Sequence, residues 1–132
     1  MQTREHAHDS YRRTQVQAST PVEQVVLLYD GALRFMNDAR GAMERRDIAA
    51  RRAAVSRTLA IVGELRGTLD MERGGEIAVS LERLYAYVTN RLMDAVMHHD
   101  TRAIDDAIRV FETLRDAWRT IATTQSASGS AA

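Results

Sequence analysis

Hydrophobic residues recur every three or four positions along most of the chain, in four stretches separated by short polar breaks. This spacing is typical of one face of an α-helix, whereas the strict alternation of a half-buried strand is rare here. We therefore expect helices over about residues 21–46, 48–70, 75–98 and 101–123. Helices of this length joined by short turns predict an all-α fold, an antiparallel up-down four-helix bundle.

The first helix has the clearest start signal. Thr20 is a suitable N-cap, Pro21 fits the first helical position, and Glu23 lies where a capping box requires an acidic residue. The residues that follow are apolar on more than one side, although a surface helix needs only one apolar stripe. We expect the extra apolar side to be covered, either by the chain itself or by a partner.

Each of the other helices carries an inner stripe that should close the core. The stripes are Val55, Leu59, Val62, Leu65 and Leu69; Ile77, Leu81, Leu84, Tyr85, Val88 and Leu92; and Ile104, Ala107, Ile108, Phe111, Leu114 and Trp118. Asp47, and Asp100 or Thr101, should cap helices, and Gly74–Gly75 should form a turn.

Both ends of the chain are polar. Residues 1–19 have only Tyr11 and Val16 as large apolar side chains and should form a mobile segment or dock loosely on the bundle. The small polar residues 124–132 should be disordered.

A second set of apolar residues lies off the inner stripes. Its members are Leu27, Leu28 and Phe35; Val79, Ala86, Met93 and Met97; and Ile61, Val110 and Ile121 at the stripe edges. Single exposed apolar residues are common on soluble proteins. As a set over several helices, however, they favour a groove for an apolar partner.

Acidic and basic residues are balanced, 18 against 18, and every basic residue is an arginine. A nucleic-acid or anionic-membrane binder would have a clear basic excess. The chain has no cysteine, which excludes disulfides and thiolate metal sites, and it has no apolar run long enough to cross a membrane. These features favour a cytosolic protein with no nucleic-acid partner and no membrane insertion.

Catalytic and metal-binding residues are not arranged as such sites require. A di-metal site in a bundle needs inward-facing Glu-x-x-His pairs, and the only such pair is Glu5 with His8 in the N-terminal segment. His98 and His99 are adjacent, so their side chains point in different directions. We expect no enzyme activity, no cofactor and no metal.

Two further features are ambiguous. The arginines Arg40, Arg45, Arg46, Arg51, Arg52 and Arg57 should form a solvated face, with contact to an acidic protein surface as the alternative. Gly63 and Gly67 would let another backbone approach, by default that of a neighbouring helix and otherwise that of a bound peptide helix.

A series of motifs resembles the flagellin-specific export chaperone family FliS. The motifs are Tyr11, Gln15-Val16, Ser19-Thr20-Pro21, the LYDGAL run of residues 28–33, Glu64-Leu65, Leu69-Asp70, the GGEIA run of residues 74–78, Leu81, Leu84-Tyr85 with Tyr87, and Trp118. They occur in order and with the right spacing from Tyr11 to about Ile121, which is most of the chain. Departures from the family pattern are minor: Thr20, Ser80 and Ala86.

The resemblance implies a non-enzymatic antiparallel bundle that binds the disordered C-terminal region of flagellin in apolar grooves in the bacterial cytosol. Such a chaperone prevents premature polymerisation and delivers flagellin to the flagellar type III export apparatus. The resemblance also implies that the N-terminal segment, here residues 11–16, occupies part of that surface when no client is bound.

We therefore expect nine residues to contact the client or its N-terminal mimic. The first-rank candidates are Tyr11, Gln15, Val16, Leu28, Tyr29 and Phe35, and the second-rank candidates are Ile61, Leu65 and Tyr87. For Tyr29 and Leu65 a place in the bundle core is an equal alternative.

Other functions and assemblies stay open at this point. The chain could be a regulatory scaffold that binds another flagellar protein, such as an anti-sigma factor or an export-gate component, or a metal-dependent bundle enzyme. It could be a monomer or a homodimer that exchanges its N-terminal segments.

Overall fold

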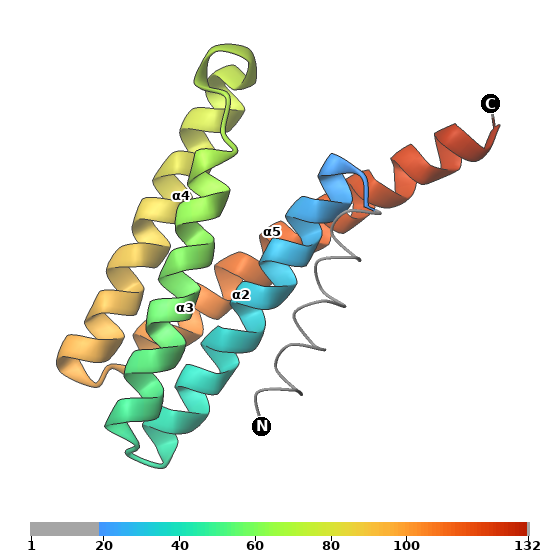
Figure 1. Cartoon of the computed structure of the whole chain (residues 1–132). Coiled ribbons are helices and arrows are strands. Elements are labelled where there is room, and N and C mark those ends of the chain that lie inside the picture. Colours follow the sequence, from blue (N-terminus) through green and yellow to red (C-terminus); the bar gives the residue numbers. More distant parts are fainter. Residues whose placement is uncertain (1–18, 132) are drawn as a thin grey trace.

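The computed structural model describes residues 19–131, with side chains up to residue 126, and this part of the chain forms a bundle of helices (Figure 1). The helices are α2 (Pro21–Glu44), α3 (Ile48–Gly67), α4 (Met71–His98) and α5 (Thr101–Ala131). α2 packs against α3 and α5, while α4 packs against α5 and less extensively against α3. The all-α antiparallel four-helix bundle predicted from the sequence is therefore confirmed.

The helix starts are capped as the sequence predicts. Thr20, Asp47 and Asp100 each accept, through a side-chain oxygen, a hydrogen bond from a backbone N–H group two or three residues later. These bonds pair donors that the first turn of a helix leaves without an intrahelical partner. Local polar residues thus fix where three of the helices begin.

The start of α4 differs from the expectation. Asp70 caps a short helical turn that begins at Met71, and Gly75 then breaks the helix with φ 52° and ψ −128°. The predicted turn at Gly74–Gly75 is therefore a kink within α4 instead of its beginning. A Cβ at Gly74 would lie 2.7 Å from the Cβ of Ala78, so the backbone there needs glycine for space.

Three predicted helix ends also differ. The helix expected to end near residue 70 is α3, which ends at Gly67. α2 ends at Glu44, and Arg46 after it has a left-handed φ of 56°. α5 continues as helix to Ala131, although we expected the helix to end near residue 123 and residues 124–132 to be disordered. This C-terminal stretch contains no proline, so no residue in it forces the helix to stop.

An aromatic cluster forms the centre of the core. The ring centroids of Tyr29 and Phe111 lie 5.0 Å apart in an edge-to-face arrangement, and those of Tyr85 and Phe111 lie 6.1 Å apart. All three side chains are fully buried, together with Met36 and Leu92. This cluster joins α2, α4 and α5, and it is built largely from the predicted inner stripes.

One predicted stripe residue is not in the core. Ile77 is 73% exposed, whereas the other stripe residues are buried or partly buried. Figure 1 shows the α3–α4 pair diverging from the α2–α5 pair toward the connection between α3 and α4. The first turns of α4 therefore extend beyond the helices that would cover them, which explains the exposure of Ile77.

Candidate partner-binding surface

The predicted contact residues occupy different environments. Three of them, Tyr11, Gln15 and Val16, lie outside the described residues. Tyr29, Leu65 and Ile61 are buried and belong to the core cluster. Tyr29 and Leu65 therefore occupy the core position that was their alternative, and Ile61 is buried with them. A partner contact at any of the three stays a prediction and would require this packing to open.

Leu28, Phe35 and Tyr87 remain accessible. Leu28 and Phe35 are partly buried against the rim of the core, and Tyr87 is 44% exposed on α4. Leu28 and Phe35 are seven residues apart on α2, so they lie on the same side of that helix, two turns from each other. They mark an apolar edge of α2 that the bundle covers only in part.

A buried pair of hydroxyl groups holds the Tyr29 side chain in the core. The Tyr29 and Tyr85 hydroxyls are 2.5 Å apart and share a buried hydrogen bond between α2 and α4. Burial raises the pKa of the Tyr29 hydroxyl, and hydrogen bonds with Tyr85 and Trp118 partly offset this. Burial and the same bond both raise the pKa of Tyr85. Both hydroxyls therefore stay protonated and hold the two helices together.

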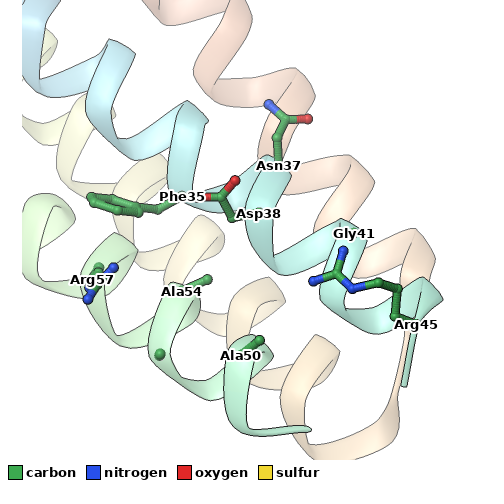
Figure 2. A pocket seen from close by; sticks show the side chains of 9 residues that line it. Phe35, Asn37, Asp38, Gly41, Arg45, Ala50, Ala54 and Arg57 are labelled. Carbon is green, nitrogen blue, oxygen red and sulfur yellow. The ribbon is translucent and has the colours of Figure 1, made fainter. Parts of the chain in front are cut away.

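Phe35 forms one wall of a groove between α2 and α3 (Figure 2). The groove has a volume of about 360 Å³ and is lined by Phe35, Asn37, Asp38, Gly41, Arg45, Ala50, Ala53, Ala54 and Arg57. Its lining on α3 consists of small alanine side chains apart from Arg57. In Figure 2 the Phe35 ring extends from α2 toward α3, on the side where Arg57 rises.

Two guanidinium groups lie over the Phe35 ring. The Cζ atom of Arg34 is 5.2 Å from the ring centroid, and that of Arg57 is 5.5 Å from it. These are cation–π distances, and the contacts orient both guanidinium groups beside the groove. Neither arginine forms an ion pair with another described residue.

The predicted arginine cluster divides in the structure. Arg40 forms an ion pair with Asp105 of α5 at 2.5 Å and another with Glu44. The remaining members make no ion pair within residues 19–126: Arg45, Arg46, Arg51, Arg52 and Arg57. Uncompensated positive charge therefore gathers at the α2–α3 end of the bundle, around the groove.

The outer face of α4 carries a second apolar surface. Val79, Met93 and Met97 are exposed, Met97 by 69%, and Ala86 is partly buried among them. Spacings of seven and four residues place these side chains on one face of the helix, nearly opposite its core face. The sequence predicted this set as surface residues, and their exposure agrees.

The first half of α2 is less covered than its apolar composition requires. From Val22 to Leu28 every residue is partly buried, and full burial begins only at Tyr29. The extra apolar side expected from the sequence is therefore not closed by the described helices. This stretch continues the edge marked by Leu28 and Phe35.

Gly63 and Gly67 do not provide a close approach between helices of the bundle. A Cβ built at either position would have no other atom within 4 Å. The default expectation of a neighbouring helix at this place is therefore wrong, because this side of α3 faces away from the bundle. The alternative, a bound peptide helix beside these two glycines, stays a prediction.

Several groove residues were not predicted from the sequence. No sequence motif marks Asp38 or the alanines Ala50, Ala53 and Ala54 of the lining, or Arg34 beside the Phe35 ring. The alanine-rich run of residues 49–54 is the available signal, since small side chains on one helix permit a groove beside its neighbour. Locating the groove also requires the relative register of α2 and α3, which the sequence does not state.

The described residues contain no cluster of three or more histidine, aspartate or glutamate side chains that could hold a metal ion. Among the helices of residues 19–131, none is both long and apolar enough to span a membrane.

The family was established by comparison with known proteins. The sequence model of the flagellar protein FliS matches residues 3–125. This chain belongs to the FliS family. The "flagellar secretion chaperone FliSB" of Pseudomonas aeruginosa is 38% identical over 104 residues, which cover 79% of this chain and 82% of the relative.

Other FliS proteins are similarly related. The flagellar secretion chaperones FliS of Campylobacter jejuni and Salmonella typhimurium are 36% and 34% identical over 115 and 107 residues. These matches cover 87% and 80% of this chain, and 90% and 79% of the relatives. A crystal structure of a bacterial flagellar chaperone has the same fold, with a TM-score of 0.71 at 16% identity over 89% of this chain and 95% of that one.

Proposed function

We propose that this FliS-family protein is a cytosolic flagellar export chaperone. It binds the disordered C-terminal region of flagellin in apolar grooves, prevents premature polymerisation and delivers flagellin to the flagellar type III export apparatus. The family and the names of its relatives support the chaperone role. The role requires binding alone, so we propose no catalytic activity.

One observation about the structure supports this proposal most directly. The bundle has a closed aromatic core, yet apolar surface is left on the α2 edge at Leu28 and Phe35 and on the outer face of α4 at Met93 and Met97. A segment that folds when it binds loses conformational entropy, and burying extended apolar surface compensates for this loss. A bundle with a closed core and surplus apolar faces can provide that surface.

The N-terminal segment is proposed to share the same surface. Tyr11, Gln15 and Val16 would cover part of the α2 edge when no client is present and leave it when flagellin binds. This proposal accounts for two large apolar side chains in a polar segment.

Polymerisation of flagellin tests the proposal. Flagellin monomers from the same organism are seeded and followed by light scattering with increasing amounts of this protein. We expect growth to stop near a one-to-one ratio, because each chaperone covers one C-terminal region. Growth that continues unchanged at several-fold molar excess of folded protein would contradict the proposal.

A further inference from the structure

The groove between α2 and α3 combines an apolar lining with oriented positive charge. The alanines of α3 and the Phe35 ring provide the apolar part. Arg57 lies at the same wall, where its contact with the ring orients the guanidinium group without using its N–H donors. A carboxylate approaching along the ring plane would find a guanidinium already in place for a two-point hydrogen bond.

The charges nearby indicate the sign of the missing partner group. Away from the groove, several arginines pair with carboxylates of the same chain, as Arg66 does with Glu82 and Arg91 with Asp106. Around the groove, Arg34, Arg45 and Arg57 have no such carboxylate among the described residues, and Asp38 is the one acidic residue in the lining. Charge complementarity therefore favours an anionic group on the molecule that fills the groove.

We propose that this groove is a subsite for an acidic position of the flagellin segment. An apolar side chain of that segment packs on Phe35 and the alanines, and a neighbouring aspartate or glutamate carboxylate binds Arg57, with Arg34 and Arg45 adding to the local positive potential. The subsite rests on the proposed function, because the occupant is the same client. It adds register to apolar binding, since a carboxylate at one position fixes how the segment lies along α2 and α3.

Calorimetric titration with a peptide of the flagellin C-terminal region tests the subsite. Arg57→Gln should weaken binding by about 5- to 20-fold, because it removes one charge-assisted contact. Asp38→Asn should tighten binding by about 2- to 5-fold, since it removes a like charge from the groove. Arg102→Gln is the matched control: Arg102 is exposed, makes no ion pair with described residues and lies on α5, and we expect no change.

A double-mutant cycle that combines peptide variants with Arg57→Gln identifies the peptide carboxylate that binds Arg57. Each aspartate or glutamate of the peptide is replaced in turn by asparagine or glutamine, and each peptide is titrated into the wild type and into Arg57→Gln. We expect one replacement to weaken binding to the wild type and to have no further effect on Arg57→Gln. Thermal melting of every variant verifies that the bundle is folded.

The outcomes separate the subsite from the chaperone role. If the wild type binds the peptide and Arg57→Gln binds as tightly as Arg102→Gln, the subsite is wrong and the proposed function stands. If the folded wild type does not bind the peptide, both are wrong. A single-stranded oligonucleotide that binds with the same dependence on Arg57 would also overturn the subsite.

Discussion

Two tyrosine hydroxyls, from Tyr29 on α2 and Tyr85 on α4, share one hydrogen bond inside an otherwise apolar cluster. A buried hydroxyl without a partner is costly, whereas a pair that satisfies each other is not. This contact accounts for both polar atoms at the centre of the bundle. Tyr29, which stands in the motif that carries the family resemblance, therefore serves the core.

Replacing one tyrosine should lower the free energy of unfolding by more than the loss of its own hydrogen bond would. Tyr29→Phe leaves the buried Tyr85 hydroxyl without its partner, and Tyr85→Phe leaves the Tyr29 hydroxyl with the Trp118 indole alone. Each change should lower the free energy of unfolding by about 1–3 kcal/mol. The double variant leaves none unpaired, so its loss should be clearly smaller than the sum of the two single losses. Urea denaturation gives the free energy of unfolding of the wild type, the two single variants and the double variant. Additive losses would show that the two hydroxyls do not depend on each other.

The same pair makes stability sensitive to high pH. The pKa of both hydroxyls is raised from the usual value of 10.0, so near that pH the unfolded chain releases protons that the folded chain retains. The stability that the pair contributes is therefore fully present below about pH 9 and is lost as the pH rises through 10.0 toward the raised pKa of the folded hydroxyls. The chain has no lysine or cysteine, which leaves few other groups to titrate there.

We expect the urea midpoint of the wild type to fall between about pH 9 and about pH 11. The Tyr29→Phe/Tyr85→Phe variant should show a much flatter profile over that interval. Equal slopes for the two proteins would contradict the assignment of this pH dependence to the buried pair.

At the scale of single helices, glycines of α3 and α4 serve opposite purposes. Gly75 has a positive φ of 52° that a residue with a side chain adopts only with strain. Gly63 lies in the exposed interior of α3, where a Cβ would meet no atom within 4 Å. The first glycine is needed by the backbone, and the second only lowers helix propensity.

Alanine substitutions should therefore change stability in opposite directions. Gly75→Ala should lower the free energy of unfolding by about 1–2 kcal/mol, and Gly63→Ala should raise it by about 0.5–1 kcal/mol. Thermal and urea unfolding of the two variants measure this directly. A stabilised Gly75→Ala would mean that the kink in α4 is not required.

The outer face of α4 can be altered without touching the core. The variant Met93→Asp/Met97→Asp changes two exposed side chains and should leave the urea midpoint nearly unchanged. If flagellin wraps onto this face, its affinity should fall by about 10-fold or more, because charged groups replace buried apolar contacts. Exposed Ile48→Asp at the start of α3 is the control. Equal affinities for the two variants would exclude α4 from the client surface.

Elements whose cause is local could be predicted from the sequence. The caps at Thr20, Asp47 and Asp100 and the stripes of α3 and α5 depend on neighbouring residues in one helix. The exposure of Ile77 could not be predicted, because it depends on how far α2 and α5 extend past the first turns of α4. The contact of Phe35 with Arg57 depends in the same way on the register between α2 and α3.

For the candidate site, the sequence predicted a set of apolar residues available to a partner, but not which of them the bundle buries. Leu28, Phe35 and Met97 are at the surface as expected, while Tyr29, Ile61 and Leu65 lie in the core. Tyr29 and Leu65 are on helix faces that both a core and a groove could use. Only the packing of four helices together distinguishes these two roles.

On the scale of the whole molecule, the full chain has no net charge, and the surplus surface of the bundle is apolar. Client binding should therefore be driven mainly by apolar burial, with charge contributing at the single subsite beside Arg57. Such binding has a negative heat-capacity change and depends only modestly on salt.

Calorimetric titration of the full-length protein with a peptide of the flagellin C-terminal region, repeated at several temperatures, tests this account most directly. The account predicts one-to-one binding, a strongly negative heat-capacity change and a gain of peptide helicity by circular dichroism. A folded, monodisperse protein that gives no binding heat at any temperature, and no gain of helicity, would contradict it.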